Sequence, residues 1–237
     1  MRWKDYIFRV EEISQERRRE MFRIMTSYYD NISWNKFIID LEEKDEVILL
    51  INQTDKVKGF TTVQIKEYVI EGEPIKIIFS GDTIVKRKYR NQFDLHKVWA
   101  NFIFHLVFHE FSDFKVYWLL LTKGYKTYRF LPLYFKTFYP KYNSSIPEFE
   151  KSIIDHYGEE NYPGTYDSQQ GIIYNHDNSN YYLKDEEAEI PEKRKSDPHI
   201  RFFAQQNPGY TRGDELVCIT ELSRDNLRPG LLRLLSR

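Results

Sequence analysis

The pattern of hydrophobic and polar positions in the first third of the chain predicts a series of strands. Residues 46–51 form a short apolar run, and residues 58–70 alternate between apolar and polar side chains. Residues 75–85 form a further stretch rich in apolar residues, and turn-forming residues separate the three segments. Short runs of this kind, bounded by turns, are typical of β-strands. We expect the second strand to run antiparallel to the first and the third to follow it.

Helical periodicity flanks these strands. After a first strand at residues 6–13, two helices are expected at residues 17–29 and 34–41, and each follows a serine that can serve as its N-cap. Between residues 95 and 107, apolar side chains recur at spacings of three and four. This spacing predicts an amphipathic helix with a wide buried face.

The segment after this helix is the most informative one. The apolar run from Val116 to Leu121 predicts a buried strand, and a polar break at residues 122–124 ends it. A tyrosine-rich stretch follows, carries Leu-Tyr-Phe-Lys at residues 133–136 and indicates an amphipathic helix that ends near Pro140. The predicted order up to that point is strand, two helices, three strands, helix, strand and helix.

The pattern is weaker in the last hundred residues. We expect a short helix around residues 149–157, a strand at residues 171–174, and a strand at residues 215–220 that closes the sheet. Residues 177–198 are rich in charged side chains and predict an exposed loop.

A buried strand that feeds a helix with the pattern Leu-Tyr-x-Lys resembles the last core segment of the GCN5-related N-acyltransferases. The order of predicted elements resembles the core of the same family. The resemblance implies an α+β fold of three α/β layers, with a mixed, mostly antiparallel sheet flanked by helices. It also implies that two neighbouring strands, here residues 75–85 and 116–121, splay apart and admit the arm of a phosphopantetheine thioester. We therefore interpret residues 1–140 as a core that binds an acyl donor. Residues 141–237 are then a C-terminal extension of the same domain that completes the sheet and covers the acceptor site.

In this family, the segment after the fourth core strand holds the pyrophosphate of coenzyme A. Val85 and Arg90 match its pattern, and we expect the donor to contact this segment: Val85, Lys86, Arg87, Lys88, Arg90, Asn91 and Gln92. Phe93 and Leu95, however, occupy positions that are small in the family, where glycine lets the backbone approach a phosphate closely. The donor is therefore either acyl-CoA or an acyl carrier protein, whose acidic surface the positive charges at residues 86–90 would suit. A solvated basic turn is the other interpretation of these charges.

The resemblance implies that Tyr134 is the acid that protonates the departing thiolate. Asp82 is the candidate general base, because a charge within an otherwise apolar strand is costly unless it is paired or functional. Gly81 beside it predicts a bulge or a close approach of the backbone. We expect three further residues to contact the acceptor: Ser80, Asp214 and Glu215. For each of these roles a structural alternative stays open. Tyr134 would then be an ordinary core tyrosine, Asp82 an aspartate that only bonds to loop amides, and residues 207–215 an ordinary hairpin connection.

Composition narrows the class of protein. The 237 residues are 41% hydrophobic and 30% charged, as in ordinary globular proteins, and the net charge of −1 gives no overall attraction to nucleic acid or to a membrane. No apolar run approaches the roughly 20 residues that cross a bilayer, and we expect a cytoplasmic protein. Cys218 is the one cysteine, which excludes an internal disulfide and a cysteine-based zinc site. His105 and His109 are spaced as on one helix face, but no third ligand is indicated, and we expect no metal.

Two functions fit these patterns. The first is an acyltransferase that moves an acyl group from a phosphopantetheine thioester to an amine on a small molecule or a peptide. The aromatic content of 16% and the long extension suggest a large pocket, and hence a medium or long acyl chain. The second is a non-catalytic module of the same fold that binds a carrier protein or a peptide, as the altered phosphate segment would suggest.

Overall fold

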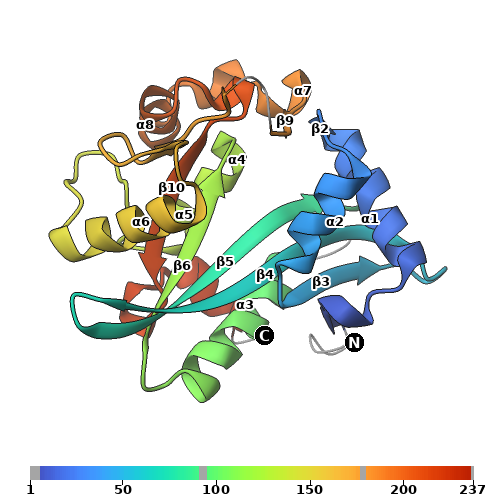
Figure 1. Ribbon diagram of the computed structural model, residues 1–237, viewed down its shortest axis with the longest axis horizontal. Coiled ribbons are helices and arrows are strands. Elements are labelled where there is room, and N and C mark those ends of the chain that lie inside the picture. Colours follow the sequence, from blue (N-terminus) through green and yellow to red (C-terminus); the bar gives the residue numbers. More distant parts are fainter. Residues whose placement is uncertain (1–5, 91–94, 177–179, 236–237) are drawn as a thin grey trace.

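The computed structural model describes residues 6–90, 95–176 and 180–235. An eight-stranded sheet forms its centre (Figure 1), with the strands in this order: β1 (Ile7–Arg9), β3 (Glu46–Ile51), β4 (Val57–Ile70), β5 (Glu73–Val85), β6 (Lys115–Thr122), β10 (Glu215–Glu221), β8 (Ile172–Ile173) and β7 (Tyr166–Asp167). All neighbouring strands in it are antiparallel except β5 and β6, which are parallel. The sheet is thus mixed and mostly antiparallel, as the sequence predicts. A small second sheet joins β2 (Tyr29–Asp30) to β9 (Tyr182–Leu183).

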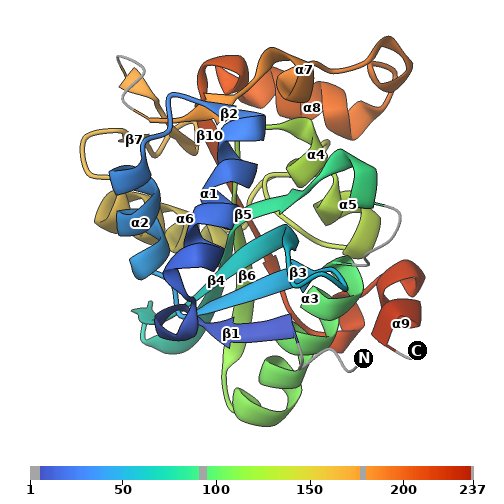
Figure 2. The ribbon, with the colours of Figure 1, turned by 90° about the vertical axis from the view of Figure 1, so that its right-hand side faces the viewer.

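Helices cover both faces of the large sheet, and Figure 2 shows the two layers. One face packs against α3 (Leu95–His105), α4 (Tyr125–Tyr128), α5 (Phe130–Tyr134), α8 (Pro198–Gln206) and α9 (Pro229–Leu235). The other face packs against α1 (Gln15–Tyr28) and α2 (Trp34–Glu42) over β3 and β4, and against α6 (Glu148–Asn161) over β6 and β10. The two groups of helices on this second face form separate apolar clusters, so the face between them is not closed by a helix.

The predicted elements form for the reasons visible in the sequence. In β3, Ile48 and Leu50 belong to the cluster on one face, and Val47 and Leu49 to a cluster on the other. This is the alternation expected of a strand that is buried on both sides. The predicted serine caps are present as well, because the side chains of Ser14 and Ser33 accept hydrogen bonds from the backbone three residues later.

Two predicted segments differ from the structure. The tyrosine-rich helix ends at Tyr134, and from Phe135 the backbone is extended, so that Tyr139 pairs with Ile219 of β10. Phe135 and Phe138 are both fully buried, with the exposed Lys136 and Thr137 between them. Bridges from Phe135 to Leu227 and from Tyr139 to Ile219 hold this stretch in an extended form.

The charged segment before residue 198 is not an exposed loop. It contains β9, α7 (Asp185–Ala188), a 3-10 turn (Glu192–Arg194) and the start of α8. Glu187 within α7 is only 5% exposed, because it forms ion pairs with cations from distant segments, and hydropathy along the chain does not reveal such pairs. No helix in the described residues has an apolar stretch long enough to cross a membrane.

β5 and β6 are paired over only part of their length. The ladder between them joins Ile75–Phe79 to Lys115–Leu119 and ends there, although β5 continues to Val85 and β6 to Thr122. The two strands diverge toward the top of Figure 1. This confirms the predicted splay, and we call the open end of the two strands the fork.

Candidate functional site

A cavity of about 1230 Å³ lies at the fork. Its volume exceeds the range of roughly 300–1,000 Å³ that is usual for small-molecule pockets. The walls come from β4, β5, the end of β6, α2, α6, and the segment from β9 to α7. Five of the residues expected from the sequence at a substrate site line it: Ser80, Asp82, Val85, Arg90 and Glu215.

A bulge in β5 turns Asp82 toward the cavity. Gly81 pairs with Thr62 and Ile84 with Phe60, so that Thr61 alone faces two residues of β5, Asp82 and Thr83. The backbone of Asp82 has a φ of 38°, a left-handed conformation that aspartate tolerates better than most residues. The hydroxyl of Thr61 donates to the carbonyl oxygen of Gly81 at 3.0 Å and so supports the bulge. The bulge that Gly81 predicts is therefore confirmed.

The surroundings of Asp82 favour its protonated form. Burial, and after it the negative charge of Asp40, raise the pKa of Asp82 to about 7, although Lys123, Lys44 and the hydroxyl of Tyr181 act in the opposite direction. The Tyr181 hydroxyl donates to Oδ1 of Asp82 at 3.1 Å. Burial and the charge of Asp82 raise the pKa of Tyr181, so this hydroxyl stays protonated at neutral pH. Asp82 thus has one tyrosine donor and a pKa at which it can exchange a proton near neutrality.

The raised pKa makes stability depend on pH in a defined direction. The folded protein holds the Asp82 proton more tightly than the unfolded chain, so this stabilisation is complete below about pH 4 and is lost as the pH rises through about 7. Asp82→Asn removes the titration. Between pH 4.5 and 8, the wild-type protein should lose about 3 kcal/mol of unfolding free energy relative to the variant. Urea unfolding of both proteins across this range measures the difference, and a difference that does not change with pH would contradict the shift.

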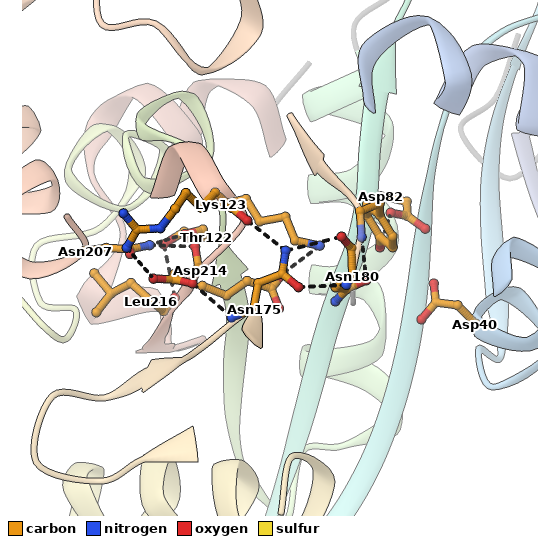
Figure 3. A network of polar contacts seen from close by, with 12 residues as sticks. Asp40, Asp82, Thr122, Lys123, Asn175, Asn180, Asn207, Asp214 and Leu216 are labelled. Atoms are coloured by element: carbon orange, nitrogen blue, oxygen red, sulfur yellow. Dashed lines mark hydrogen bonds and ion pairs between the residues drawn. The ribbon is translucent and has the colours of Figure 1, made fainter. Parts of the chain in front are cut away.

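A chain of polar contacts from the C-terminal extension holds Tyr181 against Asp82. Figure 3 shows Asp214, Asn175 and Asn180 of this chain beside Asp82. Asp214 accepts a hydrogen bond from the backbone N–H of Asn175 at 2.9 Å. Asn175 in turn accepts from the N–H of Asn180 at 2.7 Å, and Asn180 accepts from the N–H of Tyr181 at 2.9 Å. Asp214 itself does not line the cavity. The contact of Asp214 with Asn175 orders the loop that carries Tyr181, and the predicted contact of Asp214 with the acceptor stays a prediction.

Ser80 is the first residue of β5 beyond its last pair with β6. Its hydroxyl oxygen accepts two hydrogen bonds from indole N–H groups, from Trp99 of α3 at 2.9 Å and from Trp118 of β6 at 3.0 Å. A hydroxyl oxygen has two acceptor positions and one proton. With both acceptor positions in use, Ser80 can interact with a ligand only by donating its own proton.

The basic run after β5 is partly neutralised within the protein. Arg87 donates to Oε1 of Glu187 at 2.9 and 2.6 Å, and Lys126 donates to Oε2 at 2.7 Å. Burial alone would raise the pKa of Glu187, but the hydrogen bonds from Lys126 and Arg87 hold it below its usual value. Arg90 lies 3.7 Å from the same carboxylate and over the ring of Tyr28. This pairing qualifies the expected docking role of the run, since two of its four cations already have an acidic partner.

Away from the basic run, the wall of the cavity carries lysines that are paired with carboxylates. Lys44 binds Asp40 at 2.9 Å, and Lys123 binds Glu215 at 3.1 Å. The Lys123–Glu215 pair is almost wholly buried, with the two side chains 8% and 9% exposed, and Lys123 also lies 3.6 Å from the centre of the Tyr181 ring. Lys66 of β4 reaches the same wall.

The remaining predicted site residues lie elsewhere. Tyr134 is 9% exposed, and its ring stacks on Phe130 and lies near His96. Both of these neighbours line the cavity and Tyr134 does not, so its role as an acid stays a prediction. Lys86, Arg87 and Lys88 follow the strand but are not among the lining residues. The prediction for Asn91 and Gln92 falls outside the described residues.

Sequence reasoning missed the residues that surround Asp82. They include four residues. Asp40 lies in α2 and Lys44 lies two residues after that helix, Lys123 directly follows β6, and Tyr181 directly precedes β9. Lys123 had a signal in the sequence, because a lysine directly after a buried strand sits at a sheet end. The others had none. Among the described residues, no group of three or more histidine, cysteine, aspartate or glutamate side chains could hold a metal ion.

Comparison with known proteins gives only distant likenesses. No family model matches the sequence, and no curated protein matches it. A probable N-acyltransferase of unknown function from Enterococcus faecalis is 14% identical, with a TM-score of 0.42, over 56% of this chain and 32% of that protein. Glucosamine-6-phosphate N-acetyltransferase from Arabidopsis thaliana is 14% identical, with a TM-score of 0.39, over 60% of this chain and 93% of that one.

The N-myristoyltransferase of Saccharomyces cerevisiae, solved with bound myristoyl-CoA, is 10% identical, with a TM-score of 0.36, over 68% of this chain and 42% of that one. This chain therefore spans about a third of the E. faecalis protein and less than half of the yeast one. Likenesses at this level assign neither an activity nor a substrate, and the functional argument depends on the geometry of the fork.

Proposed function

We propose that this protein is an acyltransferase that moves an acyl group from a phosphopantetheine thioester to an amine. The observation that carries the proposal is the fork. The ladder between β5 and β6 ends at Phe79 and Leu119, and the next polar side chains of β5, Ser80 and Asp82, line a large cavity at that point. A slot for an extended tether and a carboxylate able to accept a proton therefore adjoin each other.

The fork suits an extended tether for a general physical reason. Backbone amide and carbonyl groups that leave a ladder need other partners. β5 runs on to Val85 beyond its last pair with β6, and a pantetheine arm carries amide groups that can bond to a strand edge as an added strand does.

Asp82 supplies the proton acceptor in this proposal. An ammonium group must lose a proton before its nitrogen can attack, and a base with a pKa of about 7 is well matched to that task at neutral pH. The nitrogen then attacks the thioester carbonyl carbon. The C–N bond forms, the C–S bond breaks, the nitrogen gives up its second proton, and the departing thiolate takes up a proton, so that one proton in total is released. We assign the acid for this last step to Tyr134 from the resemblance described above, and its position behind Phe130 and His96 requires these two side chains to move aside.

Ser80 is the candidate donor to the thioester carbonyl oxygen. Its oxygen is occupied by Trp99 and Trp118, so its proton is available to an oxygen atom in the cavity. As the carbonyl carbon is attacked, negative charge builds up on that oxygen, and a donor fixed in advance stabilises it.

The donor carries phosphopantetheine, either on coenzyme A or on an acyl carrier protein. Coenzyme A and an acyl carrier protein present the same phosphopantetheine arm to the fork. They differ in the part that stays outside the cavity, which is a nucleotide in coenzyme A and a protein surface in the carrier protein. The ion pairs of Arg87 and Arg90 with Glu187 leave Lys86 and Lys88 as the cations of the run without a carboxylate partner among the described residues. The volume of the cavity supports a medium or long acyl chain together with a small amine or the end of a peptide.

The first experiment measures donor binding and thiol release with octanoyl-CoA and with an octanoyl carrier protein. Trp99 and Trp118 both bind Ser80 at the fork, so tryptophan fluorescence should change saturably when a donor enters. Adding an amine should then release free thiol. Ser80→Ala should keep donor binding and slow thiol release by at least about tenfold.

Trp34 provides the matched control. It lies on α2 and does not line the cavity, so Trp34→Phe should leave the fluorescence change intact. If neither donor changes the fluorescence or releases thiol, the proposal is wrong. Saturable binding without thiol release for any amine would instead favour the non-catalytic module.

A further inference from the structure

We infer that the amine acceptor carries a carboxylate several bonds from its reacting nitrogen, and that Lys66 binds this carboxylate. The inference rests on the proposed function for the reacting end of the molecule. It deepens that proposal by naming the class of acceptor: an elongated amino acid such as an ω-amino acid, or a short peptide with a free C-terminus.

Lys66 lies where the helical layer on one face of the sheet is open. On β4, Lys66 and Gln64 point to the same side, which is the side of Phe79 on β5. All three line the cavity, between the wall formed by α2 and the wall formed by α6. Gln64 and Lys66 are half-buried, and Lys66 lies against the end of α6, so both side chains reach the cavity at the edge of this helix.

Lys66 differs from the other lysines of this wall in its partners. Its ammonium group donates to Oδ1 of Asn161 and lies 5.8 Å from the centre of the Tyr157 ring, and both partners are neutral. Within residues 6–90, 95–176 and 180–235, no carboxylate oxygen lies within 4.0 Å of its nitrogen. Lys44 and Lys123, in contrast, are each paired with a carboxylate. Lys66 is thus a cation in a cavity wall that is held in place by neutral groups and keeps an attraction for an anion.

Glu43 and Glu160 line the same cavity, but neither carboxylate lies within 4.0 Å of the Lys66 ammonium group. Lys44 lies 2.9 Å from Asp40 and 3.8 Å from Glu43 and offsets part of their charge. Glu160 lies 3.9 Å from the imidazole of His156, which offsets its charge only when that ring is protonated. Lys66 is therefore not held in a direct ion pair with either carboxylate.

Among the described side chains, Asp82, which we assign to the reacting amine, forms a hydrogen bond with the hydroxyl of Tyr181 alone. An acceptor that places its ammonium group at Asp82 and its carboxylate at Lys66 would match the charge of each residue with an opposite charge.

The separation of the two residues sets the length of the acceptor. Lys66 pairs with Ile77, and Thr62 pairs with Gly81, the residue before Asp82. Four residues of β4 thus separate the two positions, or roughly 13 Å along the strand. This separation applies to the backbone positions. We expect an acceptor with several bonds between its nitrogen and its carboxylate to match it better than an α-amino acid, in which a single carbon joins the two groups.

The test uses pairs of amines that differ only in the carboxylate. 8-Aminooctanoate is compared with octylamine, and triglycine with its C-terminal amide, using one acyl donor. In the wild-type protein, kcat/KM for the carboxylate member of each pair should be at least about tenfold higher, as one charged hydrogen bond implies. Lys66→Met should remove this preference, and Lys66→Arg should retain part of it. Lys193→Met, an exposed lysine far along the sequence that does not line the cavity, is the control and should leave the preference unchanged.

The outcomes separate this inference from the proposed function. Equal kcat/KM values within each pair, or a preference that survives in Lys66→Met, would overturn the carboxylate site while acyl transfer stands. If no amine releases thiol, calorimetric titration of the same ligands into the protein decides the question without turnover. Tighter binding of 8-aminooctanoate than of octylamine, lost in Lys66→Met, supports the site. Equal binding of the two ligands, or no binding of either, overturns it.

Discussion

Asp82→Asn should lower the rate of acyl transfer at pH 7 by about a hundredfold or more, since a positioned general base contributes roughly 10²–10⁴. The asparagine side chain fills nearly the same space and can still accept the hydrogen bond from Tyr181, but it cannot take a proton from the ammonium group. In the wild-type protein, the rate should rise with pH through about 7, because Asp82 must lose its own proton first. Thiol release with a saturating amine, measured from pH 5.5 to 8.5, reports both effects.

Two controls accompany this variant. Donor binding, followed by tryptophan fluorescence, should change little in Asp82→Asn, because the substitution leaves Ser80 and the two tryptophans in place. Asp113→Asn removes an exposed carboxylate at the other end of β6 and should leave the rate unchanged. A rate for Asp82→Asn within about threefold of the wild-type rate would exclude this residue as the base, as threefold is far below the contribution of a general base.

Lys123→Met should lower the free energy of unfolding by about 3 kcal/mol, the usual cost of leaving one member of a buried ion pair without its partner. Glu215 is then an unpaired carboxylate of which only 9% of the side chain is exposed. The contact of the ammonium group with the Tyr181 ring is lost as well. Urea unfolding monitored by circular dichroism gives the change, provided that the slope of free energy against urea stays constant.

Matched variants identify the cause of this loss. The double variant Lys123→Met with Glu215→Leu removes both charges and should recover most of the stability, because an apolar pair of similar volume often replaces a buried ion pair at little cost. Lys195→Met makes the same substitution in the exposed pair with Glu192, whose side chains are 58% and 87% exposed. It should cost less than about 0.5 kcal/mol. A loss in Lys123→Met as small as that in Lys195→Met would show that the buried pair does not stabilise the fold.

The alternation of side chains was sufficient to predict the frame of the site. β3, β4 and β5 are buried on one or both faces, and their period of two is visible in the sequence without knowledge of their partners. The bulge was predictable as well, because glycine next to a charged residue inside an apolar strand is a local signal. These features depend on residues that are neighbours along the chain.

The charged wall around Asp82 was not predictable. Asp40, Lys123 and Tyr181 come from α2, the end of β6 and the C-terminal extension, and they meet only after the sheet has formed. Nothing in the sequence distinguishes Asp214, which precedes β10 and orders a loop, from Glu215, the first residue of β10, which lines the cavity. Likewise, the acidic run with Glu187 looks like a solvated loop until Arg87, Arg90 and Lys126 are placed around it.

The hydrophobic period and the turn residues, which act over a few positions, were thus enough to predict the main strands and helices up to β6, their order and the position of Asp82 in β5. The place where β5 and β6 part, the carboxylates that lack a cation, and the lysine that faces a cavity with neutral partners follow only from the folded arrangement. These properties depend on burial and on charges brought together from distant segments. The pKa of Asp82 and the attraction of Lys66 for an anion are set by such neighbours, and so they exist only in the folded protein.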